Sequence, residues 1–149
     1  LYWHIRKIVI SHDDSDDVLQ NTFIKVYKNI EKFKGDSKLY SWMYRIATNE
    51  AITHLNRNAK HNHRSSEEMQ TKAVNSLTSD VYFEGDEIQL KLQKAIATLP
   101  RKQQLVFNMR YFDDIKYKEM ADILETSEGA LKASYHLAVK KIETYLTQD

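Results

Sequence analysis

Aromatic and cationic side chains crowd the stretch of sequence between residues 32 and 45. The aromatic members are Phe33, Tyr40, Trp42 and Tyr44, and the cationic ones are Lys32, Lys34, Lys38 and Arg45. On a helix Tyr40 and Tyr44 lie four residues apart and share one face, with Arg45 beside them. Exposed rings can stack on unpaired bases, which stabilises binding by about 1 to 3 kcal/mol per base, while cationic side chains bind the backbone phosphates. A single ring, above all Trp42, belongs more often to a core, so the prediction of a segment that binds single-stranded DNA depends on the group.

A second group, near the C-terminus, predicts a helix-turn-helix. A short helix over 117–124 meets a turn at 125–127, and a longer helix follows from Glu128. Ser127 can cap the second helix, whose outward face could enter a major groove. That face carries Gly129, Lys132, Ala133, His136 and Lys140. Glu125 stands where such turns often have Gly, and a left-handed conformation there costs about 1 kcal/mol. An ordinary helical hairpin with solvated lysines is the alternative.

A third group combines His12 with the acidic run Asp13, Asp14, Asp16 and Asp17, and further histidines follow at His54, His61 and His63. Neither set has a recognised metal-ligand spacing, and the run lacks the Gly and the closing Glu of a calcium loop. Acidic residues at the start of a helix cap it and interact favourably with its dipole. We therefore expect no metal site, no cofactor, no small-molecule substrate and no catalytic residue. The protein is predicted not to be an enzyme.

The composition predicts an all-α fold. With three Gly and one Pro in 149 residues, the chain has few of the residues that form hairpin turns. The absence of Cys excludes disulfides and thiolate zinc sites, and no apolar run approaches the roughly 20 residues that cross a bilayer. We expect a protein of the cytoplasm, without direct membrane insertion. Because residue 1 is Leu, we expect the natural chain to begin earlier.

The net charge of +1 is small for a protein that binds DNA. Phosphate neutralisation supplies most non-specific affinity, so tight binding by the chain alone would need a larger basic excess. We therefore expect a partner to hold the protein on DNA.

The elements that position these groups form two helical lobes. The second is predicted to contain four helices. The first is predicted to contain three: after the last turns of a truncated helix over 1–10 come two complete helices, one after the acidic run and one from residue 39 to about Arg57. Their predicted buried faces consist, respectively, of Leu19, Phe23, Val26, Tyr27 and Ile30, and of Leu39, Met43, Ile46, Ala47, Ala51 and Leu55. The polar stretch that follows is typical of a tether, although a short helix inside it stays possible. The predicted domains are 1–57, a linker over 58–85, and 86–149.

Taken together, these segments resemble the extracytoplasmic-function group of bacterial sigma factors. The stretch from Asp17 to Tyr27 is similar to the family's polymerase-binding helix. The runs Phe33-Lys-Gly-Asp-Ser and Trp42-Met-Tyr-Arg-Ile-Ala-Thr-Asn resemble its minus-ten segment, and the stretch from Leu99 to Tyr135 resembles its C-terminal helix-turn-helix domain. The resemblance covers nearly the whole chain except the tether.

The resemblance implies a promoter-specificity subunit that binds core RNA polymerase, through the β′ clamp and the β flap, and directs initiation at minus-ten and minus-thirty-five elements. The implied polymerase contacts are Asp17, Gln20, Asn21 and Phe23. The implied minus-ten residues are Phe33, Lys34, Gly35, Asp36, Ser37, Tyr40, Trp42, Tyr44, Arg45 and Asn49, around a base flipped out of the non-template strand. The implied minus-thirty-five residues are Ser127, Gly129, Lys132, Ala133, Ser134, His136 and Lys140.

The resemblance also implies an anti-sigma factor as a partner, and a place in the bacterial cytoplasm on the nucleoid. Two further function classes remain open at this point. A free-standing dimeric helix-turn-helix regulator would account for the second lobe, but it leaves the aromatic segment and the helix from Asp17 without a purpose. A protein-interaction module without a DNA role is the other class.

Overall fold

The computed structural model describes residues 1–36, 38–77 and 85–148, and every regular element in these ranges is helical. The all-α class predicted from composition is confirmed. The elements in chain order are α1 (Tyr2–Val9), α2 (His12–Asn29), the 3-10 turn η1 (Ile30–Lys32), α3 (Leu39–His61), α4 (Ser66–Asn75), α5 (Glu87–Ala97), α6 (Arg101–Tyr111), α7 (Tyr117–Leu124) and α8 (Glu128–Thr147).

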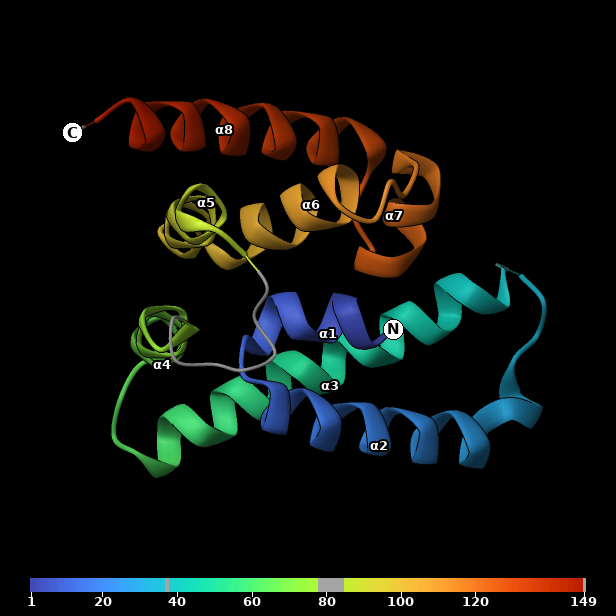
Figure 1. Cartoon of the computed structure of the whole chain (residues 1–149). Helices are drawn as coiled ribbons and strands as arrows, with labels where there is room; N and C mark the ends of the chain where they lie inside the picture. The colour runs from blue at the N-terminus through green and yellow to red at the C-terminus, as the bar shows by residue number, and fades with distance from the viewer. Residues whose placement is uncertain (37, 78–84, 149) are drawn as a thin grey trace.

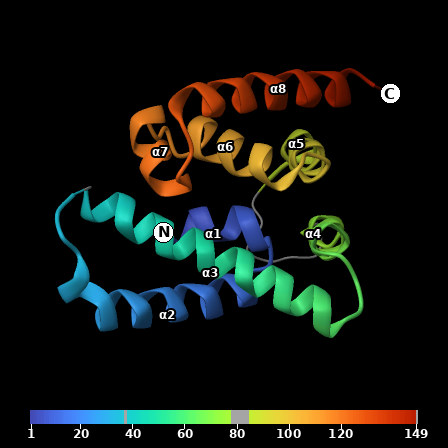
Figure 2. The same ribbon diagram turned by 180° about the vertical axis from the view of Figure 1, so that it is seen from behind.

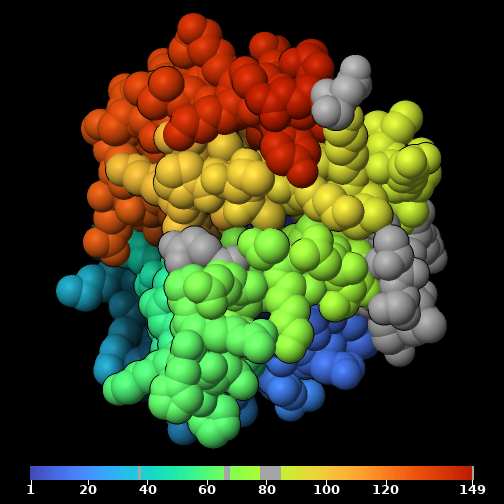
Figure 3. Space-filling view, turned by 90° about the vertical axis from the view of Figure 1, so that its left-hand side faces the viewer, coloured from blue at the N-terminus to red at the C-terminus, as the bar shows by residue number. Residues whose placement is uncertain are grey.

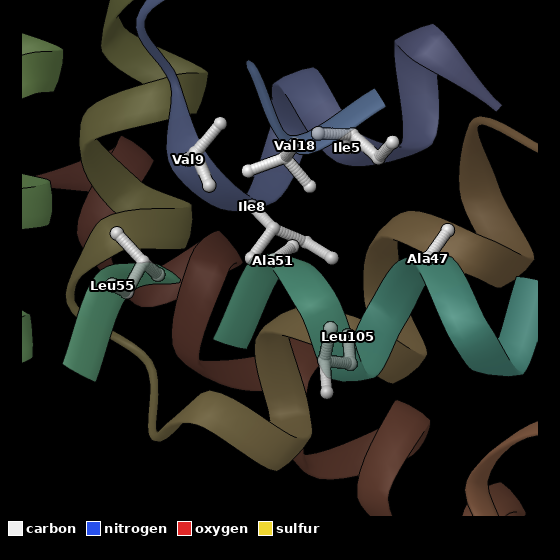
Figure 4. Close-up of a cluster of buried hydrophobic side chains, with 8 residues drawn as sticks. All are labelled: Ile5, Ile8, Val9, Val18, Ala47, Ala51, Leu55 and Leu105. Atoms are coloured by element: carbon white, nitrogen blue, oxygen red, sulfur yellow. The ribbon is translucent and has the colours of Figure 1, made fainter. Parts of the chain in front are cut away.

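Helices α1, α2 and α3 pack together as the first lobe (Figure 1). Their core, shown in Figure 4, consists of Ile5, Ile8, Val9, Val18, Ala47, Ala51 and Leu55, joined by Leu105 from α6. Fully burying an aliphatic side chain stabilises a fold by about 1.5 to 3 kcal/mol. Ala47 and Ala51 are both 0% exposed, and their small side chains let the neighbouring helices approach α3 closely.

The buried face of α2 differs from the predicted one. Ser15, Val18 and Thr22 are at most 1% exposed, whereas Phe23 is 48% and Tyr27 is 84% exposed. Both sets recur at steps of three and four residues, so the periodicity identified the helix and not the side that is buried. The hydroxyl groups of Ser15 and Thr22 can be buried because each donates a hydrogen bond to the carbonyl oxygen four residues earlier.

Helix α3 is longer than predicted, since it continues to His61 instead of ending near Arg57. Ala47, Ala51 and Leu55 of its predicted inward face are buried, but Leu39 is 44% exposed. Leu39 lies in the first turn of α3, beyond the part of the helix that joins the core cluster, and it is therefore only partly covered.

Helices α5 to α8 form the second lobe, in which α6 and α8 pack along each other. Its inner core consists of Ala95, Ile96, Leu99, Phe107, Ala138 and Ile142. Figures 1 and 2 show this lobe as a layer of helices above α1 and α3, with α8 on the outside.

Helix α4 lies within the stretch 58–85 that the sequence predicts to be a tether. Val74 and Leu77 are 1% and 4% exposed and pack with Ile10. The Gln70 side chain donates to the Ile8 carbonyl oxygen over 3.1 Å. Because α4 also packs against α3 and α5, this part of the stretch connects the lobes directly, as Figure 3 shows for the light green α4 and the yellow-green α5. The division into 1–57, 58–85 and 86–149 remains a prediction.

The two lobes meet along a surface that we call the seam. Helix α3 packs against α7, and α1 packs against α6. Each lobe places a side chain in the core of the other: Leu105 of α6 joins the first lobe, and Tyr44 of α3 joins Val106, Met109, Met120 and Leu131 in the second. The seam is therefore an interdigitated contact with an apolar centre.

Candidate nucleic-acid interface

Helices α7 and α8 form the predicted helix-turn-helix. Met120, Ile123 and Leu131 fix the two helices against each other, each at most 3% exposed. Glu125 ends α7 in the left-handed conformation, with φ 52° and ψ 47°. The Ser127 hydroxyl then accepts a hydrogen bond from the Ala130 amide over 3.2 Å and caps α8. The turn and the cap both lie where the sequence predicts them.

The outward face of α8 is open to solvent. Its exposed members include Ser127, Gly129, Lys132, Ala133, His136 and Lys140, while Ser134 is partly buried. Lys132 also lies 5.8 Å from the centre of the Tyr117 ring, which orients its ammonium group without burying it. Figures 1 and 2 place α8 on the side of the second lobe remote from α2.

The predicted minus-ten segment begins at the end of η1 and continues into α3. Phe33 and Trp42 approach to 5.3 Å between ring centres and are partly buried, so they brace the loop against the helix. Gly35 has φ 77°, a conformation that a side chain would strain. The other exposed members are Lys34, Asp36, Tyr40 and Asn49. Ser37 lies outside the described residues.

Tyr44, which the resemblance places at the minus-ten element, lies at the seam and is only 6% exposed. Its ring stacks on His4 at 4.5 Å and lies at 4.5 Å from the Tyr40 ring. Burial and the hydrogen bond with Tyr40 raise the pKa of the Tyr44 hydroxyl. In this arrangement the second lobe covers Tyr44, whereas Tyr40 remains 45% exposed.

Two cations of the same segment are held by α7. Arg45 donates from Nε to the Asp122 carbonyl oxygen over 3.0 Å, donates to the same oxygen through Nη2, and lies 3.7 Å from a Glu125 carboxylate oxygen. Lys38 donates to Glu119 over 2.5 Å, and that carboxylate raises the pKa of the Lys38 ammonium group. Both cations therefore contact protein groups where the prediction has them contact DNA.

A third polar contact joins the lobes at Asp113, just after α6. Lys7 donates to Asp113 over 2.5 Å, and His4 Nδ1 lies 3.7 Å from the other carboxylate oxygen. Burial acts to raise the pKa of Asp113, but the approach of His4 and the ammonium of Lys7 outweigh it and hold that pKa below its usual range. Lys7 and Asp113 are 106 positions apart, so no local motif in the sequence could have identified the pair.

The predicted polymerase contacts lie on the outer side of α2. Asp17, Gln20, Asn21 and Phe23 are all exposed, and so are three apolar residues that the prediction missed: Ile24, Tyr27 and Ile30, at 51%, 84% and 43%. Large exposed apolar residues gathered along α2 and the η1 turn that follows it are typical of a protein-protein contact. The signal was present in the sequence, since the apolar residues of α2 outnumber those that one buried face can take.

The acidic run at the start of α2 acts as a helix terminus. Ser11, rather than an aspartate, is the N-cap, and its hydroxyl accepts a hydrogen bond from the Asp14 amide over 3.4 Å. Asp13 and Asp14 occupy the first turn, where the helix dipole favours negative charge. Residues 1–36, 38–77 and 85–148 contain no group of three or more side chains placed to hold a metal ion.

Two sequence models of known families match this chain. "Sigma-70 region 2" matches residues 1–61, and "Sigma-70, region 4" matches residues 89–142. The chain belongs to the sigma-70 family. Among curated relatives, the "ECF RNA polymerase sigma-E factor" of Haemophilus influenzae is 29% identical over 90% of this chain and 75% of its own length. The "RNA polymerase sigma-H factor" of Pseudomonas aeruginosa is 27% identical over 95% of this chain and 78% of its own.

Solved structures show the same fold. The sigma factor RpoE from Bartonella quintana, solved with the anti-sigma factor NepR, has a TM-score of 0.74 at 17% identity, over 99% of this chain and 90% of its own. CnrH, solved with the cytosolic domain of CnrY, has a TM-score of 0.69 at 18% identity, over 97% and 79%. This sigma factor is thus of the extracytoplasmic-function group: a promoter-specificity subunit of RNA polymerase.

Sigma factors are non-catalytic initiation factors, whose partners are core RNA polymerase and promoter DNA. A free-standing regulator would leave the region 2 match at residues 1–61 without a role. None of the helices in the described part of the chain is long and apolar enough to span a membrane.

Proposed function

We propose that this sigma factor binds core polymerase through the outer side of α2, opens the minus-ten element with the segment from Phe33 to Asn49, and reads the minus-thirty-five element with α8. The observation that carries the proposal is the order of the three surfaces along one chain that matches both sigma regions. No residue is assigned a catalytic role, because the three surfaces bind and position other molecules. Action on promoters places the protein on the nucleoid, in the bacterial cytoplasm.

The polymerase contact combines apolar and polar groups on α2. Phe23, Ile24 and Tyr27 supply exposed apolar area, and Asp17 and Gln20 lie one or two turns earlier along the helix. An apolar centre with a polar rim is the usual composition of a specific protein-protein interface. The β′ clamp is the proposed partner of this surface, and the β flap is the proposed partner of the second lobe.

The minus-ten contact uses rings and cations on one short segment. Tyr40 and Trp42 supply ring faces, and Lys34 and Arg45 can follow phosphates. Unstacking a base costs a few kcal/mol, which stacking on two or three rings can offset. The minus-thirty-five contact is different, because α8 presents Lys132 and Lys140 with Ala133, His136 and Leu137 exposed between them. Without arginine on this face, phosphate contacts and duplex shape dominate over bidentate reading of guanine.

An anti-sigma factor is a further proposed partner. RpoE was solved with the anti-sigma factor NepR, and CnrH was solved with the cytosolic domain of CnrY. The fold that RpoE shares with this chain supports a similar contact. Co-purification of the full chain from its own cells, followed by identification of bound proteins, tests it. The contact is contradicted if the chain is recovered only with polymerase subunits in both induced and uninduced cells.

The decisive experiment is transcription in vitro with core polymerase and a library of genomic DNA from the source organism. We expect discrete start sites that require the sigma factor. Trp42→Ala should reduce strand opening, measured by permanganate reactivity of thymines, more than it reduces closed-complex formation. Ile88→Ala is the matched control, because Ile88 is 77% exposed on α5 and lies outside all three surfaces. Absence of any start site would refute the proposal.

A separate measurement tests the polymerase contact. Phe23→Ala and Tyr27→Ala should each weaken binding to core polymerase by roughly tenfold, as expected for exposed aromatic anchors of an interface. Trp3→Ala is the control, since Trp3 is an aromatic residue that is 65% exposed on α1 and lies on neither α2 nor the second lobe. Unchanged co-elution of the α2 variants with core polymerase in gel filtration would show that the polymerase contact does not lie on this side of α2.

A further inference from the structure

We infer that a hollow at the seam is a binding site for a small organic diphosphate, such as a nucleoside diphosphate. The hollow has a volume of about 520 Å³, and it is lined by α3 of the first lobe and by α6, α7 and the turn after α7 of the second. Among its polar and charged lining residues are Arg45, Asn49, Arg101, Lys102, Glu125 and Thr126. Such a ligand plays no part in the function proposed above, and its binding is measurable on the free sigma factor.

The charged side chains that line the hollow are three cations and one carboxylate. Arg45 comes from α3, whereas Arg101 and Lys102 belong to the first turn of α6. The carboxylate of Glu125 lies 3.7 Å from Arg45 Nε, but the Glu125 side chain is 73% exposed, so water and salt screen its charge. The hollow therefore keeps an excess of positive charge. Like charges gathered in one place repel each other, and an anion between them turns that repulsion into attraction.

Arg101 and Lys102 lie at the end of α6 that disfavours positive charge. The N-terminus of a helix carries a partial positive charge, which favours anions and disfavours cations. The first turn of α6 contains no acidic residue, its N-cap is Pro100, and no described side chain caps it. The amide groups of a helix N-terminus bind phosphates well. A phosphate here would meet side-chain charges and main-chain dipoles of the same sign, which explains why two cations occupy this turn.

Arg45 is already oriented for binding. Its Nε and Nη2 atoms donate to the Asp122 carbonyl oxygen, and its side chain remains 35% exposed. These two hydrogen bonds use two of the five N–H groups of a guanidinium, so up to three can face a phosphate. A side chain that is held in place loses little further freedom when a ligand binds. Lys102 is exposed, and its longer, flexible ammonium group can reach a second phosphate.

The rest of the hollow suits the organic part of a ligand. Ile52 and Leu124 are partly exposed in its lining, and Leu105 adds to the apolar area. Asn49 supplies an amide group, and the Thr126 hydroxyl, which donates to the Leu124 carbonyl oxygen over 3.0 Å, can still accept a hydrogen bond. Apolar walls with a few polar groups, in a volume of about 300 to 1,000 Å³, are typical of small-molecule sites. A single phosphate would leave most of this volume unfilled.

The first test titrates the free, full-length sigma factor with ADP in magnesium-free buffer, by isothermal calorimetry. We expect a dissociation constant between about 1 and 100 µM, with pyrophosphate and adenosine each binding at least tenfold more weakly. Absence of ADP binding up to about 1 mM would overturn the site. Pyrophosphate that binds as tightly as ADP would overturn the role of the apolar lining, and adenosine that binds as tightly would overturn the role of the cations.

Neutral variants locate the ligand in the hollow. We expect Arg101→Gln to weaken ADP binding by about tenfold and Lys102→Gln by about three- to tenfold, because each loses a charged hydrogen-bond donor. Lys118→Gln has the same change of charge at an exposed position of α7 outside the hollow, and it should stay within about twofold of wild type. Equal losses in all three variants would indicate general charge attraction and would overturn the site.

Two further measurements separate folding from binding. The urea midpoint without ligand shows whether each variant is folded, and Arg101→Lys, which keeps the charge, should recover most of the ADP binding that Arg101→Gln loses. Because the ligand contacts both lobes, saturating ADP should raise the thermal midpoint of wild type by several degrees, and the double variant Arg101→Gln with Lys102→Gln should show no rise. An equal rise in the double variant would place the ligand elsewhere and overturn the site.

Promoter DNA is the competing occupant of the hollow. Lys102 belongs to none of the three proposed surfaces, so we expect Lys102→Gln to leave the affinity of the holoenzyme for a mapped promoter within about twofold of wild type. A loss for promoter DNA as large as the loss for ADP would make the hollow part of the DNA surface and overturn the inference. Failure of ADP binding alone would leave the proposed function intact, since transcription in vitro tests that function separately.

Discussion

At the scale of single residues, the two surfaces that we propose to bind DNA differ in how accessible their cations are. Lys132 and Lys140 on α8 are exposed, whereas Lys38 and Arg45 near the start of α3 contact α7. A cation in solvent can meet a phosphate directly, but a cation in an ion pair must first leave its partner. The minus-thirty-five contact is therefore expected to form first.

Replacing Lys132 or Lys140 by Ala should weaken closed-complex binding and lower the slope of log affinity against log salt by about one for each phosphate that the variant no longer neutralises. The measurement is filter binding of the holoenzyme to a mapped promoter at several salt concentrations. Lys91→Ala, on α5, is the control with the same change of charge. The Lys91 ammonium group donates to the Leu146 carbonyl oxygen at the C-terminal end of α8, outside the proposed DNA surface. A slope unchanged in both α8 variants would contradict the proposed phosphate binding.

His4 should make stability depend on pH. Burial lowers the pKa of His4 below 6.5, against the opposing effect of Asp113. Its Nε2 lies 2.7 Å from the Thr48 hydroxyl, which itself donates to the Tyr44 carbonyl, so Nε2 carries the proton of the neutral ring. The unfolded chain takes up a proton as pH falls below 6.5 while the folded chain resists it, so stability is present above pH 6.5 and is lost on acidification.

His4→Gln should flatten this dependence, because Gln can still donate to Thr48 but does not titrate. The measurement is the urea midpoint from about pH 7.5 to about pH 5.5. His61→Gln, at an exposed position, should show the same fall in urea midpoint on acidification as the wild type. Equal pH dependence in wild type and His4→Gln would exclude His4 as the cause.

At the scale of elements, the turn of the helix-turn-helix carries a local strain. Glu125 holds φ 52°, a region in which a side chain costs about 1 kcal/mol relative to Gly. The turn survives because Ser127 caps α8 and because Met120 and Leu131 pack beneath it. The N-cap of α8 and the buried residues beneath the turn thus stabilise a conformation that is unfavourable for Glu125.

Glu125→Gly should raise stability by about 0.5 to 1 kcal/mol, measured as a higher urea midpoint with an unchanged slope. Glu125→Ala is the matched control: it removes the same charge and the contact with Arg45, yet keeps the Cβ atom and should bring no gain. If Ala and Gly stabilise equally, charge rather than backbone conformation is the cause.

Helices α2 and α4 show the limits of periodicity. The apolar residues of α2 exceed one face, so the sequence alone could not choose between the side with Val18 and the side with Tyr27. The packing of α1 and α3 made that choice. Helix α4 has few apolar residues, yet its Val74, and Leu77 just after the helix, are buried because they pack with Ile10 and Leu90 from other parts of the chain.

At the scale of the whole molecule, the seam couples the lobes. Leu105 and Tyr44 each lie in the core of the opposite lobe, so unfolding of either lobe opens a cavity in the other. A small lobe is marginal by itself, since it buries a modest share of its unfolded surface. We therefore expect free sigma factor to unfold as one cooperative unit.

Ile142→Ala tests this coupling. Ile142 is 5% exposed and belongs to the core cluster of the second lobe, and its truncation should cost about 2 to 4 kcal/mol. Both tryptophans, Trp3 and Trp42, belong to the first lobe, so their fluorescence reports that lobe alone. We expect their urea midpoint to fall with the variant. Leu137→Ala, at a position 48% exposed on α8, is the control, and an unmoved tryptophan transition in Ile142→Ala would show independent lobes.

The sequence by itself determined what depends on near neighbours along the chain. The helical class and the turn at Glu125 with its cap at Ser127 follow from local propensity and spacing. The ordered motifs from Asp17 to Tyr135 indicate a sigma factor through their resemblance to that family. Tertiary structure alone decided which face of α2 is buried, that α4 packs, and that Tyr44 and Arg45 lie beneath α7. These features depend on contacts such as Lys7 with Asp113, 106 positions apart, and local sequence carries no signal for a partner so distant because only the folded packing brings the two side chains together.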